Sequence, residues 1–456
     1  MQKRIREYLK DVAISKGRRI DVGLIGYGTT AKAVLEAVRE CDFIHRITVR
    51  HGGTPDSLPI ESAELICGED ALKDITEDVI FTSPSVRRER LKYPSSSIIT
   101  SDTEIFFAES VKSVFAVSGS DGKSTVTTIA SLLLSPTFPN LFTGGNLGTP
   151  VAYAPLSSDA FLLELSSFNL RYAEPRSKRA LITNVTPNHL DWHEVLKEYE
   201  ECKARLIRST EEAVIPLSCP FNERLAETVN AFALVSGLHT DKELRERYQT
   251  AHTVTKEHGY ICADGERLIP EDSIRLREAH NRENLMSAIA LTLGYASREH
   301  ISEVARSFQG LSHRCQRMTC GGKEYIDSSI DTTPERTRTT LTSLDKRVHL
   351  ILGGRGKGLP LDTMRDALIK YAESISLYGE MRDEIDAWLG ADAELSKIPR
   401  ESFARLGDAI DRADDSAHAG ETILLSPAAT SYGEFTSYLE RGEFFKNHIV
   451  KKHGQI

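Results

Sequence analysis

A glycine-rich turn near residue 120 carries the residue types that bind a chain of phosphates. Its sequence, Gly119-Ser120-Asp121-Gly122-Lys123-Ser124-Thr125, follows an apolar run at 114–117 and opens a helical pattern. Backbone N–H groups and a helix N-terminus would converge there on one anion. Lys123 supplies a positive charge for the terminal phosphates, and the hydroxyl of Ser124 or Thr125 suits Mg²⁺. The usual pattern has glycine where Val117 stands, so we predict a shortened phosphate loop that binds a nucleotide. The alternative is a surface turn that happens to contain Gly-Lys.

Two side chains able to bind metal stand where further apolar runs end. Glu164 closes the run 160–164, and His189 follows the run 180–185. In open α/β sheets, ligands gather at the carboxyl ends of the strands, where the phosphate loop would also lie. We therefore expect Glu164 and His189 to belong to a site beside the phosphates, and metal binding is one interpretation of Glu164. For Glu164 the alternative is a helix-capping or hydrogen-bonded acid, because a buried charge is costly without a partner.

Lys203 falls within the apolar stripe of the helical pattern that follows His193. Positions 196, 199 and 206 share one helix face with it. One interpretation is snorkelling, in which the stem packs and the ammonium reaches water. The other is a desolvated amine with a depressed pKa, which reacts with carbon dioxide to give an anionic carbamate beside Mg²⁺. The spacing alone leaves both interpretations open.

A second glycine turn, Gly26-Tyr-Gly28-Thr29-Thr30-Ala31, follows the apolar run 20–25. It resembles a dinucleotide fingerprint, but an NAD site would have Asp or Glu at the end of the next strand. Here the strand expected at 46–49 runs into Arg50, which argues against an NAD site. A pyrophosphate-bearing ligand remains, with Arg50 available to an anion or a base. The alternative is a glycine turn that only lets helix and strand pack closely.

Three blocks must position these residues, and each alternates apolar runs with helical patterns. That alternation predicts an α/β fold with parallel sheets and crossover helices. The blocks begin at the run 20–25, near Ser113 with the phosphate loop, and near His313; the last carries expected strands at 348–352, 374–378 and 422–425. The boundaries that we predict are 1–111, 112–312 and 313–456.

Composition narrows the class of protein. The chain has 456 residues, a formal net charge of −9 at pH 7, and 40% hydrophobic and 27% charged residues. The negative charge argues against nucleic acid as the main partner. No apolar run is long enough to cross a bilayer, and the first ten residues lack the apolar core of a signal peptide. The seven scattered cysteines fit neither a disulfide framework nor a zinc site. We expect a cytoplasmic protein that does not bind membranes.

Further motifs in a fixed order make the chain resemble the Mur ligase family, and in particular its D-glutamate-adding branch. The resemblance runs nearly end to end. It rests on the phosphate loop and on the segments Thr143-Gly-Gly-Asn146-Leu-Gly148, Glu164-Leu-Ser166-Ser-Phe168, Asn188-His189-Leu-Asp191, Cys202-Lys203-Ala-Arg-Leu-Ile207, His280-Asn281-Arg-Glu-Asn284-Leu, Leu311-Ser-His313-Arg314, Leu352-Gly-Gly-Arg-Gly-Lys357 and Leu425-Ser-Pro-Ala-Ala-Thr-Ser431.

The resemblance implies a three-domain enzyme and its reaction. A Rossmann-like first domain would hold the UDP end of the substrate, a central P-loop-type domain with a mostly parallel sheet would hold ATP, and a Rossmann-like third domain would hold the incoming amino acid. The enzyme would be a monomer that uses ATP and Mg²⁺ to add D-glutamate to UDP-N-acetylmuramoyl-L-alanine through an acyl phosphate, in peptidoglycan precursor synthesis.

The same resemblance implies roles for individual residues. Lys123 would hold the β- and γ-phosphates, Ser124 or Thr125 with Glu164 one Mg²⁺, and His189 with a carbamylated Lys203 a second. Further expected contacts are Asn281 and Asn284 on the adenine side, Arg314 and Asp327 to ATP from the third domain, Asn146 and Ser166 to the acyl substrate, Thr29, Thr30 and Arg50 to uridine, and Thr332, Lys357 and Ser431 to D-glutamate.

One segment departs from the family. Members often read Asp-Ser-Lys-Ala-Thr in the third domain, whereas this chain reads Asp327-Ser-Ser-Ile-Asp-Thr332-Thr-Pro334. The lysine is missing, and the aspartate register is ambiguous between Asp327 and Ser328. The alternatives for the whole chain are a sister Mur or folylpolyglutamate-type ligase with another acceptor, a P-loop kinase of small molecules, and a binding module without turnover.

Overall fold

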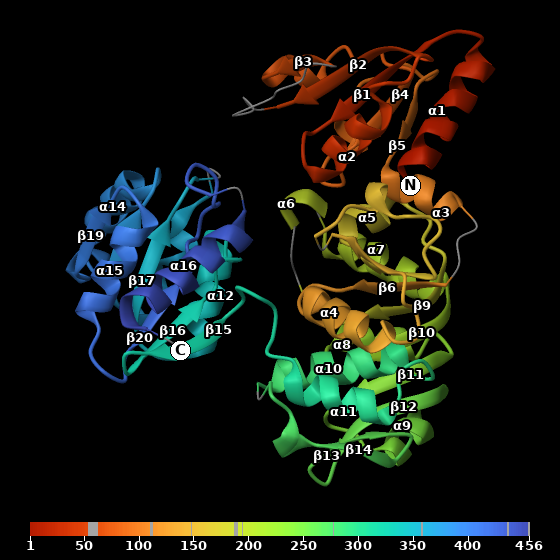
Figure 1. Ribbon diagram of the computed structural model, residues 1–456. Coiled ribbons are helices and arrows are strands. Elements are labelled where there is room, and N and C mark those ends of the chain that lie inside the picture. The colour runs from red at the N-terminus through yellow and green to blue at the C-terminus, as the bar shows by residue number, and fades with distance from the viewer. Residues whose placement is uncertain are drawn as a thin grey trace. The chain divides into compact units, whose positions relative to one another are not determined.

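The computed structural model describes residues 1–52, 63–109, 113–146, 148–186, 190–193, 195–276, 278–356, 359–435 and 437–454. They divide into two compact units, Met1–Phe308 and Gln309–Ile456. Over these residues the strands form three sheets, two in the first unit and one in the second (Figure 1). Most neighbouring strands are parallel and are joined by helices, which confirms the predicted α/β class.

The first sheet is parallel and has the strand order β3-β2-β1-β4-β5. Its elements are α1 (Gln2–Lys16), β1 (Ile20–Ile25), α2 (Thr29–Val38), β2 (Ile44–His51), β3 (Glu64–Cys67), η1 (Glu69–Leu72), β4 (Val79–Thr82), η2 (Arg88–Arg90), β5 (Ile98–Thr100) and α3 (Asp102–Ala108). The strand order reverses between β1 and β4. The carboxyl ends of these two strands therefore form the crevice in which open α/β sheets bind ligands.

The second sheet has the order β14-β13-β12-β11-β10-β9-β6-β8-β7 and is antiparallel only where β12, β13 and β14 pair. Its strands are β6 (Val114–Ser118), β7 (Leu141–Gly145), β8 (Ala160–Glu164), β9 (Ser177–Ile182), β10 (Thr210–Pro216), β11 (Ala231–Ser236), β12 (Thr250–Glu257), β13 (Tyr260–Ala263) and β14 (Glu266–Pro270). Its helices are α4 (Lys123–Leu134), η3 (Val151–Tyr153), α5 (Ser167–Tyr172), α6 (Leu190–His193), α7 (Leu196–Arg208), α8 (Pro220–Ala226), α9 (Asp241–Arg247), η4 (Glu271–Ser273), α10 (Ala279–Thr292) and α11 (Arg298–Ser307).

Helices cover both faces of this sheet. α4, α10 and α11 share one buried apolar cluster with the strands, and α5, α7 and α8 contribute to another. A strand covered on both faces is typically a nearly continuous apolar run. All five residues of β6 are buried, and Ser118 at its end is the polar one. The continuous apolar run that precedes the phosphate loop is therefore the signature of a central parallel strand.

The second unit holds a sheet of order β15-β16-β20-β17-β18-β19, in which only β15 is antiparallel to its neighbour. Its elements are β15 (Gln316–Cys320), β16 (Lys323–Asp327), α12 (Pro334–Leu344), β17 (Val348–Gly353), η5 (Leu361–Met364), α13 (Arg365–Tyr371), β18 (Ala372–Tyr378), α14 (Arg382–Ala391), η6 (Leu395–Lys397), β19 (Arg400–Phe403), α15 (Leu406–Ser416), β20 (Thr422–Leu425) and α16 (Tyr438–His453). α12 and α13 pack in one apolar cluster, and α15 and α16 pack in another.

The predicted strands mostly coincide with the observed ones. The runs 20–25 and 422–425 form β1 and β20 with those bounds. The run 180–185 forms β9, which ends at Ile182. It ends early because the next residues bond the phosphate loop: the carbonyl of Asn184 accepts from the N–H of Ser120 at 2.8 Å.

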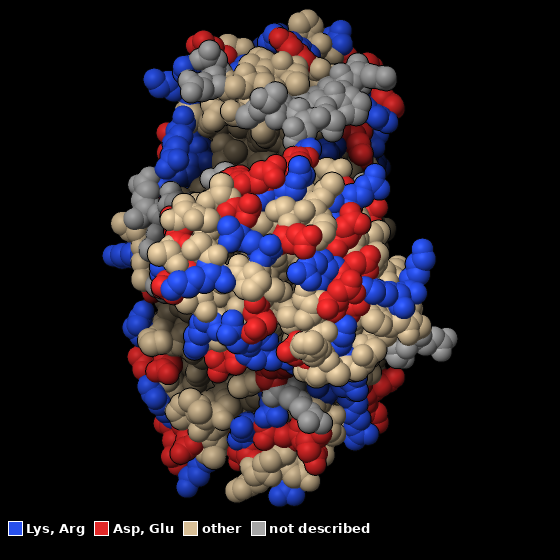
Figure 2. Space-filling view, turned by 90° about the vertical axis from the view of Figure 1, so that its left-hand side faces the viewer, with Lys and Arg blue, Asp and Glu red and all other residues tan. Residues whose placement is uncertain are grey.

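The surface and the helices are consistent with the composition. On the face shown in Figure 2, lysine and arginine alternate with aspartate and glutamate. None of the helices in the described ranges is both long and apolar enough to cross a lipid bilayer. All seven cysteines are free thiols.

Candidate active site

The turn between β6 and α4 has the shape of a phosphate loop, and two glycines make it possible. Gly119 has φ +141°, and a Cβ there would lie 1.9 Å from Oγ1 of Thr183. Gly122 has φ +79°, and a Cβ there would lie 2.3 Å from Oδ1 of Asn284. Any other residue would displace the turn, because neither backbone conformation nor space allows a side chain. The expected strand, turn and helix are all present.

Residues after β9 and on α7 anchor this loop. Besides the bond to its carbonyl, Asn184 accepts from the N–H of Asp121 at Oδ1, at 3.0 Å. The hydroxyl of Ser120 lies 2.7 Å from that of Tyr199 and 3.1 Å from the carbonyl of Thr186. Neither Asn184 nor Tyr199 was predicted as a site residue. The feature that could have identified them is their position: Asn184 follows a buried strand, and Tyr199 lies in the apolar stripe of a helix.

Lys123 folds back over the loop that it follows. Its Nζ donates to the carbonyl oxygens of Gly119, at 3.0 Å, and Ser120, at 2.7 Å. The ammonium is thus held by carbonyl oxygens of the loop itself. Its expected contact with the terminal phosphates stays a prediction.

Lys203 lies beneath the same loop and is 1% exposed. Its Nζ donates to the carbonyl oxygen of Gly119 at 2.7 Å and lies 4.6 Å from the ring centroid of Tyr199. Snorkelling is therefore the wrong interpretation, because the ammonium ends at a buried carbonyl and not in water. Burial, and after it the positive charge of Lys123, lowers the pKa of Lys203 well below its usual value.

Glu164 ends β8 beside the phosphate loop, since it pairs with Val117 of β6. It is 1% exposed, and its Oε1 accepts from Nδ2 of Asn146 at 2.7 Å. Its Oε2 is buried and has no hydrogen-bond partner among the described residues. The alternative of a hydrogen-bonded acid thus explains one oxygen only.

The unpartnered oxygen of Glu164 fits a hard cation such as Mg²⁺, which prefers carboxylate and hydroxyl oxygens. The hydroxyls of Ser124 and Thr125 lie in the first turn of the neighbouring helix. Within the described ranges, no three His, Cys, Asp or Glu side chains form a metal-ligand group. His189, the other expected ligand, lies outside the described residues.

Asn284 lies against the phosphate loop, whereas Ser166 caps a helix. The side chain of Asn284 packs against Gly122, so α10 brings it to the phosphate loop. Asn281 is one turn away and donates to Glu278 at 3.2 Å. Ser166 caps α5 by accepting from the N–H of Asn169, so the structure gives it a structural contact. Its expected contact with the acyl substrate stays a prediction.

The first sheet presents its glycine turn at the crevice between β1 and β4. Gly26 is a packing glycine, because a Cβ there would lie 2.5 Å from Oγ of Ser83. Gly28 precedes α2, whose first residues are Thr29 and Thr30. A Cβ on Gly28 would meet no atom of the described part of the chain within 4 Å, which leaves room for a ligand at the start of this helix.

The prediction for Arg50 needs correction. Arg50 is 5% exposed, and its Nε donates to Oε1 of the fully buried Glu77 at 2.8 Å. Its other donors bond the carbonyls of Ala71, Lys73 and Asp74 at 3.1–3.2 Å. A buried carboxylate needs such a partner. Arg50 is therefore committed to the first sheet, and we no longer expect it to contact a ligand.

In the second unit, both carboxylate oxygens of Asp327 have partners. Asp327 ends β16 and is buried; its Oδ2 lies 2.6 Å from Nδ1 of His313, and its Oδ1 accepts from the N–H of Ser329. Oγ of Ser328 accepts from the N–H of Cys315 at 3.4 Å. Arg314, which follows His313, is exposed.

The expected acceptor residues of this unit lie after neighbouring strands. Thr332 follows β16, and Ser431 follows β20. The buried Arg441 joins the two loops, donating to Oγ of Ser329 at 2.9 Å and to the carbonyl of Ala429 at 3.1 Å. Lys357 lies outside the described residues.

Comparison with known proteins identifies the family. The model of the Mur ligase middle domain matches residues 117–292. A UDP-N-acetylmuramoylalanine–D-glutamate ligase of Ruminiclostridium cellulolyticum is 31% identical over 393 residues, which cover 82% of this chain and 82% of that protein. The chain belongs to the Mur ligase family. A protein of the same name from Clostridium kluyveri is 29% identical to this Mur ligase over 445 residues, covering 94% of this chain and 96% of the other.

Solved structures show the same fold. The UDP-N-acetylmuramate–alanine ligase MurC of Thermotoga maritima has a TM-score of 0.57 and 16% identity, over 95% of this Mur ligase and 100% of MurC. MurF of Acinetobacter baumannii has a TM-score of 0.53 and 16% identity, over 94% and 90% of the two chains. The three-domain α/β fold of the Mur ligases is therefore the fold of this chain.

Within the first unit, the structure of this Mur ligase brings together three of the residues expected around the phosphates. Lys123 and Lys203 meet at Gly119, and Glu164 pairs with the strand that leads into the loop. Arg314, Asp327, Thr332 and Ser431 belong to the second unit and are described within it.

Proposed function

We propose that this Mur ligase uses ATP to join D-glutamate to UDP-N-acetylmuramoyl-L-alanine. Relatives that carry the name UDP-N-acetylmuramoylalanine–D-glutamate ligase, at about 30% identity over most of the chain, support the substrate pair. The observation that carries the chemistry is Lys203, a buried amine bonded to the phosphate loop itself. A loop that only gripped a nucleotide would not need an amine at that place.

The reaction needs an activated carboxyl group. A free carboxylate does not form an amide at neutral pH, because hydroxide is a very poor leaving group. In the proposed route, the terminal carboxylate of the L-alanyl group attacks the γ-phosphorus of ATP, and ADP leaves. The amine of D-glutamate then attacks the acyl phosphate, loses a proton, and phosphate leaves.

The residues of the loop must neutralise charge during this transfer, because both reacting groups are anionic. Lys123 would move from the loop carbonyls to the β- and γ-phosphates. Backbone N–H groups of the loop and the start of α4 would hold the remaining phosphate oxygens. Asn146 would orient the acyl substrate and, through Oε1 of Glu164, is itself oriented.

Mg²⁺ would shield the phosphate charge and align the transfer when bound. Glu164 with Ser124 or Thr125 would hold one ion. Carbamylation supplies a second anionic ligand: the neutral amine of Lys203 attacks carbon dioxide, a C–N bond forms and one proton is released. The carbamate, with His189, would hold a second ion.

The three expected domains would share the substrates. Residues 1–111 would bind the UDP group at the crevice of the first sheet, with Thr29 and Thr30 at the start of α2. Residues 112–312 would bind ATP, with Asn281 and Asn284 on the adenine side. Residues 313–456 would bind D-glutamate through Thr332, Lys357 and Ser431 and would bring Arg314 and Asp327 to ATP. We further propose that the enzyme works as a cytoplasmic monomer.

One assay tests the proposal. Phosphate release is measured with ATP, Mg²⁺, UDP-N-acetylmuramoyl-L-alanine and a panel of amino acids. We expect release only with D-glutamate. Equal release with L-alanine, L-lysine or diaminopimelate would assign another acceptor. A stable phosphorylated product without free phosphate would assign a small-molecule kinase.

A further inference from the structure

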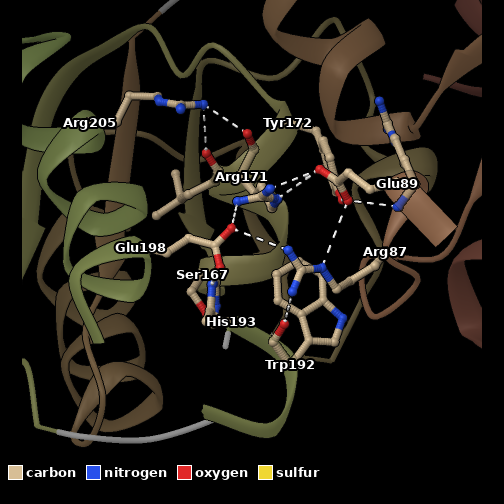
Figure 3. Close-up of polar contacts among 11 residues, drawn as sticks. Arg87, Glu89, Ser167, Arg171, Tyr172, Trp192, His193, Glu198 and Arg205 are labelled. Carbon is tan, nitrogen blue, oxygen red and sulfur yellow. Dashed lines mark hydrogen bonds and ion pairs between the residues drawn. The ribbon is translucent and has the colours of Figure 1, made fainter. Parts of the chain in front are cut away.

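The charged cluster drawn in Figure 3 shows how this protein satisfies carboxylates that are partly removed from water. It lies in the first unit, where Oε1 of Glu198 accepts from Arg171 and, at 3.5 Å, from Nη2 of Arg87. Glu89 accepts from Nη2 of the same Arg171 at 2.8 Å. Removing a carboxylate from water costs free energy, and the arginines offset that cost.

Among the described residues of the second unit, three aspartates are buried, namely Asp327, Asp331 and Asp414. Two of them have cationic partners: Asp327 lies 2.6 Å from Nδ1 of His313, and Asp414 accepts from Nζ of Lys323 at 2.9 Å. Asp331 is 5% exposed, and no Lys, Arg or His in the described ranges forms an ion pair with it. Asp331 is therefore the buried aspartate of this unit that lacks a described counter-charge.

Two hydroxyl groups hold one oxygen of Asp331. Oδ2 accepts from Oγ1 of Thr340 at 2.7 Å and from Oγ of Ser426 at 2.8 Å. Oδ1 accepts from no described residue, and it is not sealed off from solvent. The carboxylate is thus fixed through one oxygen, while the other keeps its capacity to accept a hydrogen bond.

Asp331 and Ser426 meet at the place in the sheet where a ligand is expected. Asp331 lies in the connection from β16 to α12, and Ser426 directly follows β20, which pairs with β16 in parallel. α12 packs in one apolar cluster, and α16, which follows β20, packs in the other, on the opposite face of the sheet. Open α/β sheets bind ligands beyond two strands whose connections leave toward opposite faces. The bond between Asp331 and Ser426 therefore crosses such a crevice.

The residues proposed for D-glutamate leave one of its groups without a counterpart. Thr332, Lys357 and Ser431 offer two hydroxyl groups and an ammonium, which suit the two carboxylates of the amino acid. None of them offers a negative charge to its ammonium group. Thr332 follows Asp331 directly in the chain, and Ser431 lies in the loop that begins at Ser426. Asp331 thus supplies the missing charge where the other contacts are expected.

We propose that Asp331 binds the ammonium group of the incoming amino acid through Oδ1. The inference rests on the proposed function, which places the amino acid in this unit. A hydrogen bond between an ammonium and a carboxylate is among the strong ones, because both groups are charged. The segment around Asp331 suits a cation for a second reason: it has two aspartates and no lysine, where the usual Asp-Ser-Lys-Ala-Thr pattern has one acid and one lysine.

The test compares an acceptor that has the amine with a molecule that lacks it. Phosphate release gives the KM for D-glutamate, and inhibition by glutarate, the same diacid without the amine, gives a Ki. In Asp331→Asn we expect the KM to rise by about 10- to 100-fold, the range for a hydrogen bond to a charged group, while kcat stays within about threefold. The Ki of glutarate should stay unchanged or fall, because a negative charge is removed from its surroundings.

Two further variants control this comparison. Asp383 is an exposed aspartate of α14, so Asp383→Asn should keep the wild-type KM and Ki. Thr340→Val removes one of the two donors that fix Oδ2 of Asp331. It should raise the KM by about fivefold, as expected for one neutral hydrogen bond, and leave the Ki unchanged. This variant replaces Asp331→Asn if that protein does not fold.

The outcomes separate the inference from the proposed function. A wild-type KM in folded Asp331→Asn would overturn the inference alone. A Ki that rises in parallel with the KM would also overturn it, because that pattern reports damage to the whole site. Phosphate release with another amino acid in place of D-glutamate would overturn the proposed acceptor alone; the KM of that amino acid and the Ki of its amine-free analogue then enter the same comparison. A wild type that releases no phosphate with any amino acid would overturn both.

Discussion

Lys123 and Lys203 donate to the same carbonyl oxygen, that of Gly119, with Nζ–O distances of 3.0 and 2.7 Å. Two ammonium groups on one acceptor repel each other, and the buried one is the easier to neutralise. Burial and the charge of Lys123 lower the pKa of Lys203. The arrangement therefore favours a neutral, nucleophilic Lys203 at the base of the phosphate loop.

Replacing the buried amine should remove catalysis without unfolding the protein. We expect Lys203→Ala to lower kcat by about 10²-fold or more, because a charged group next to the transferred phosphoryl is lost. Acetate or another short carboxylate, added in excess, should restore part of the rate by occupying the place of the carbamate. Lys197→Ala, an exposed lysine on the same helix, is the control and should keep the wild-type rate. A wild-type rate for Lys203→Ala in bicarbonate-free buffer would contradict the carbamate.

The pH at which the Lys203 carbamate forms should depend on the charge of Lys123. Carbon dioxide reacts only with the neutral amine, and the lowered pKa of Lys203 makes that form available far below the usual value of 10.5. Removing the neighbouring positive charge favours the protonated amine and so raises the pKa. In Lys123→Met, the carbamate signal in ¹³C NMR with labelled bicarbonate should therefore appear at higher pH than in the wild type. Lys197→Met should leave the profile unchanged, and an unshifted profile in Lys123→Met would refute the coupling.

Replacing Glu164 should lower the activity and raise the stability of the protein, because its Oε2 has no hydrogen-bond partner among the described residues. Glu164→Gln keeps an acceptor for Asn146 but removes a buried charge whose Oε2 has no partner among the described residues. We expect a loss of activity of about 10²-fold and a gain of about 1 kcal/mol in the free energy of unfolding. Calorimetric melting and ATP binding in EDTA provide the measurements, with the exposed Glu201→Gln as the control. An active Glu164→Gln with wild-type Mg²⁺ dependence would exclude Glu164 as a ligand.

Arg50 should prove to be a structural residue. Arg50→Met leaves the carboxylate of Glu77 buried without its cation, which should lower the free energy of unfolding by about 3–5 kcal/mol. Arg50→Met with Glu77→Leu should recover most of this loss, since an apolar pair of similar volume carries no desolvation cost. Urea unfolding measures both variants. The KM for the UDP substrate should stay at the wild-type value in the double variant; a large rise would return Arg50 to the binding site.

Sequence by itself determined the features that depend on neighbours along the chain. The phosphate loop is readable because an apolar run, glycines and a helical pattern follow each other within a few residues. β1 and β20 coincide with their apolar runs for the same reason. Glu164 was placed at a strand end beside the loop, and the strand pairing of the structure agrees.

Only the tertiary structure decided which side chains meet across long stretches of chain. The spacing of apolar residues did not decide whether the ammonium of Lys203 reaches water or is buried. Its partner, the carbonyl of Gly119, lies 84 residues away in the chain. Arg50 was predicted to contact a ligand, because its partner Glu77 lies 27 residues further along the chain and local sequence does not reveal the pairing. Asp327 likewise meets His313, which lies 14 residues before it in the chain. The physical reason is that local pattern fixes which faces are apolar, whereas the partner of a buried charge depends on how whole elements pack against one another.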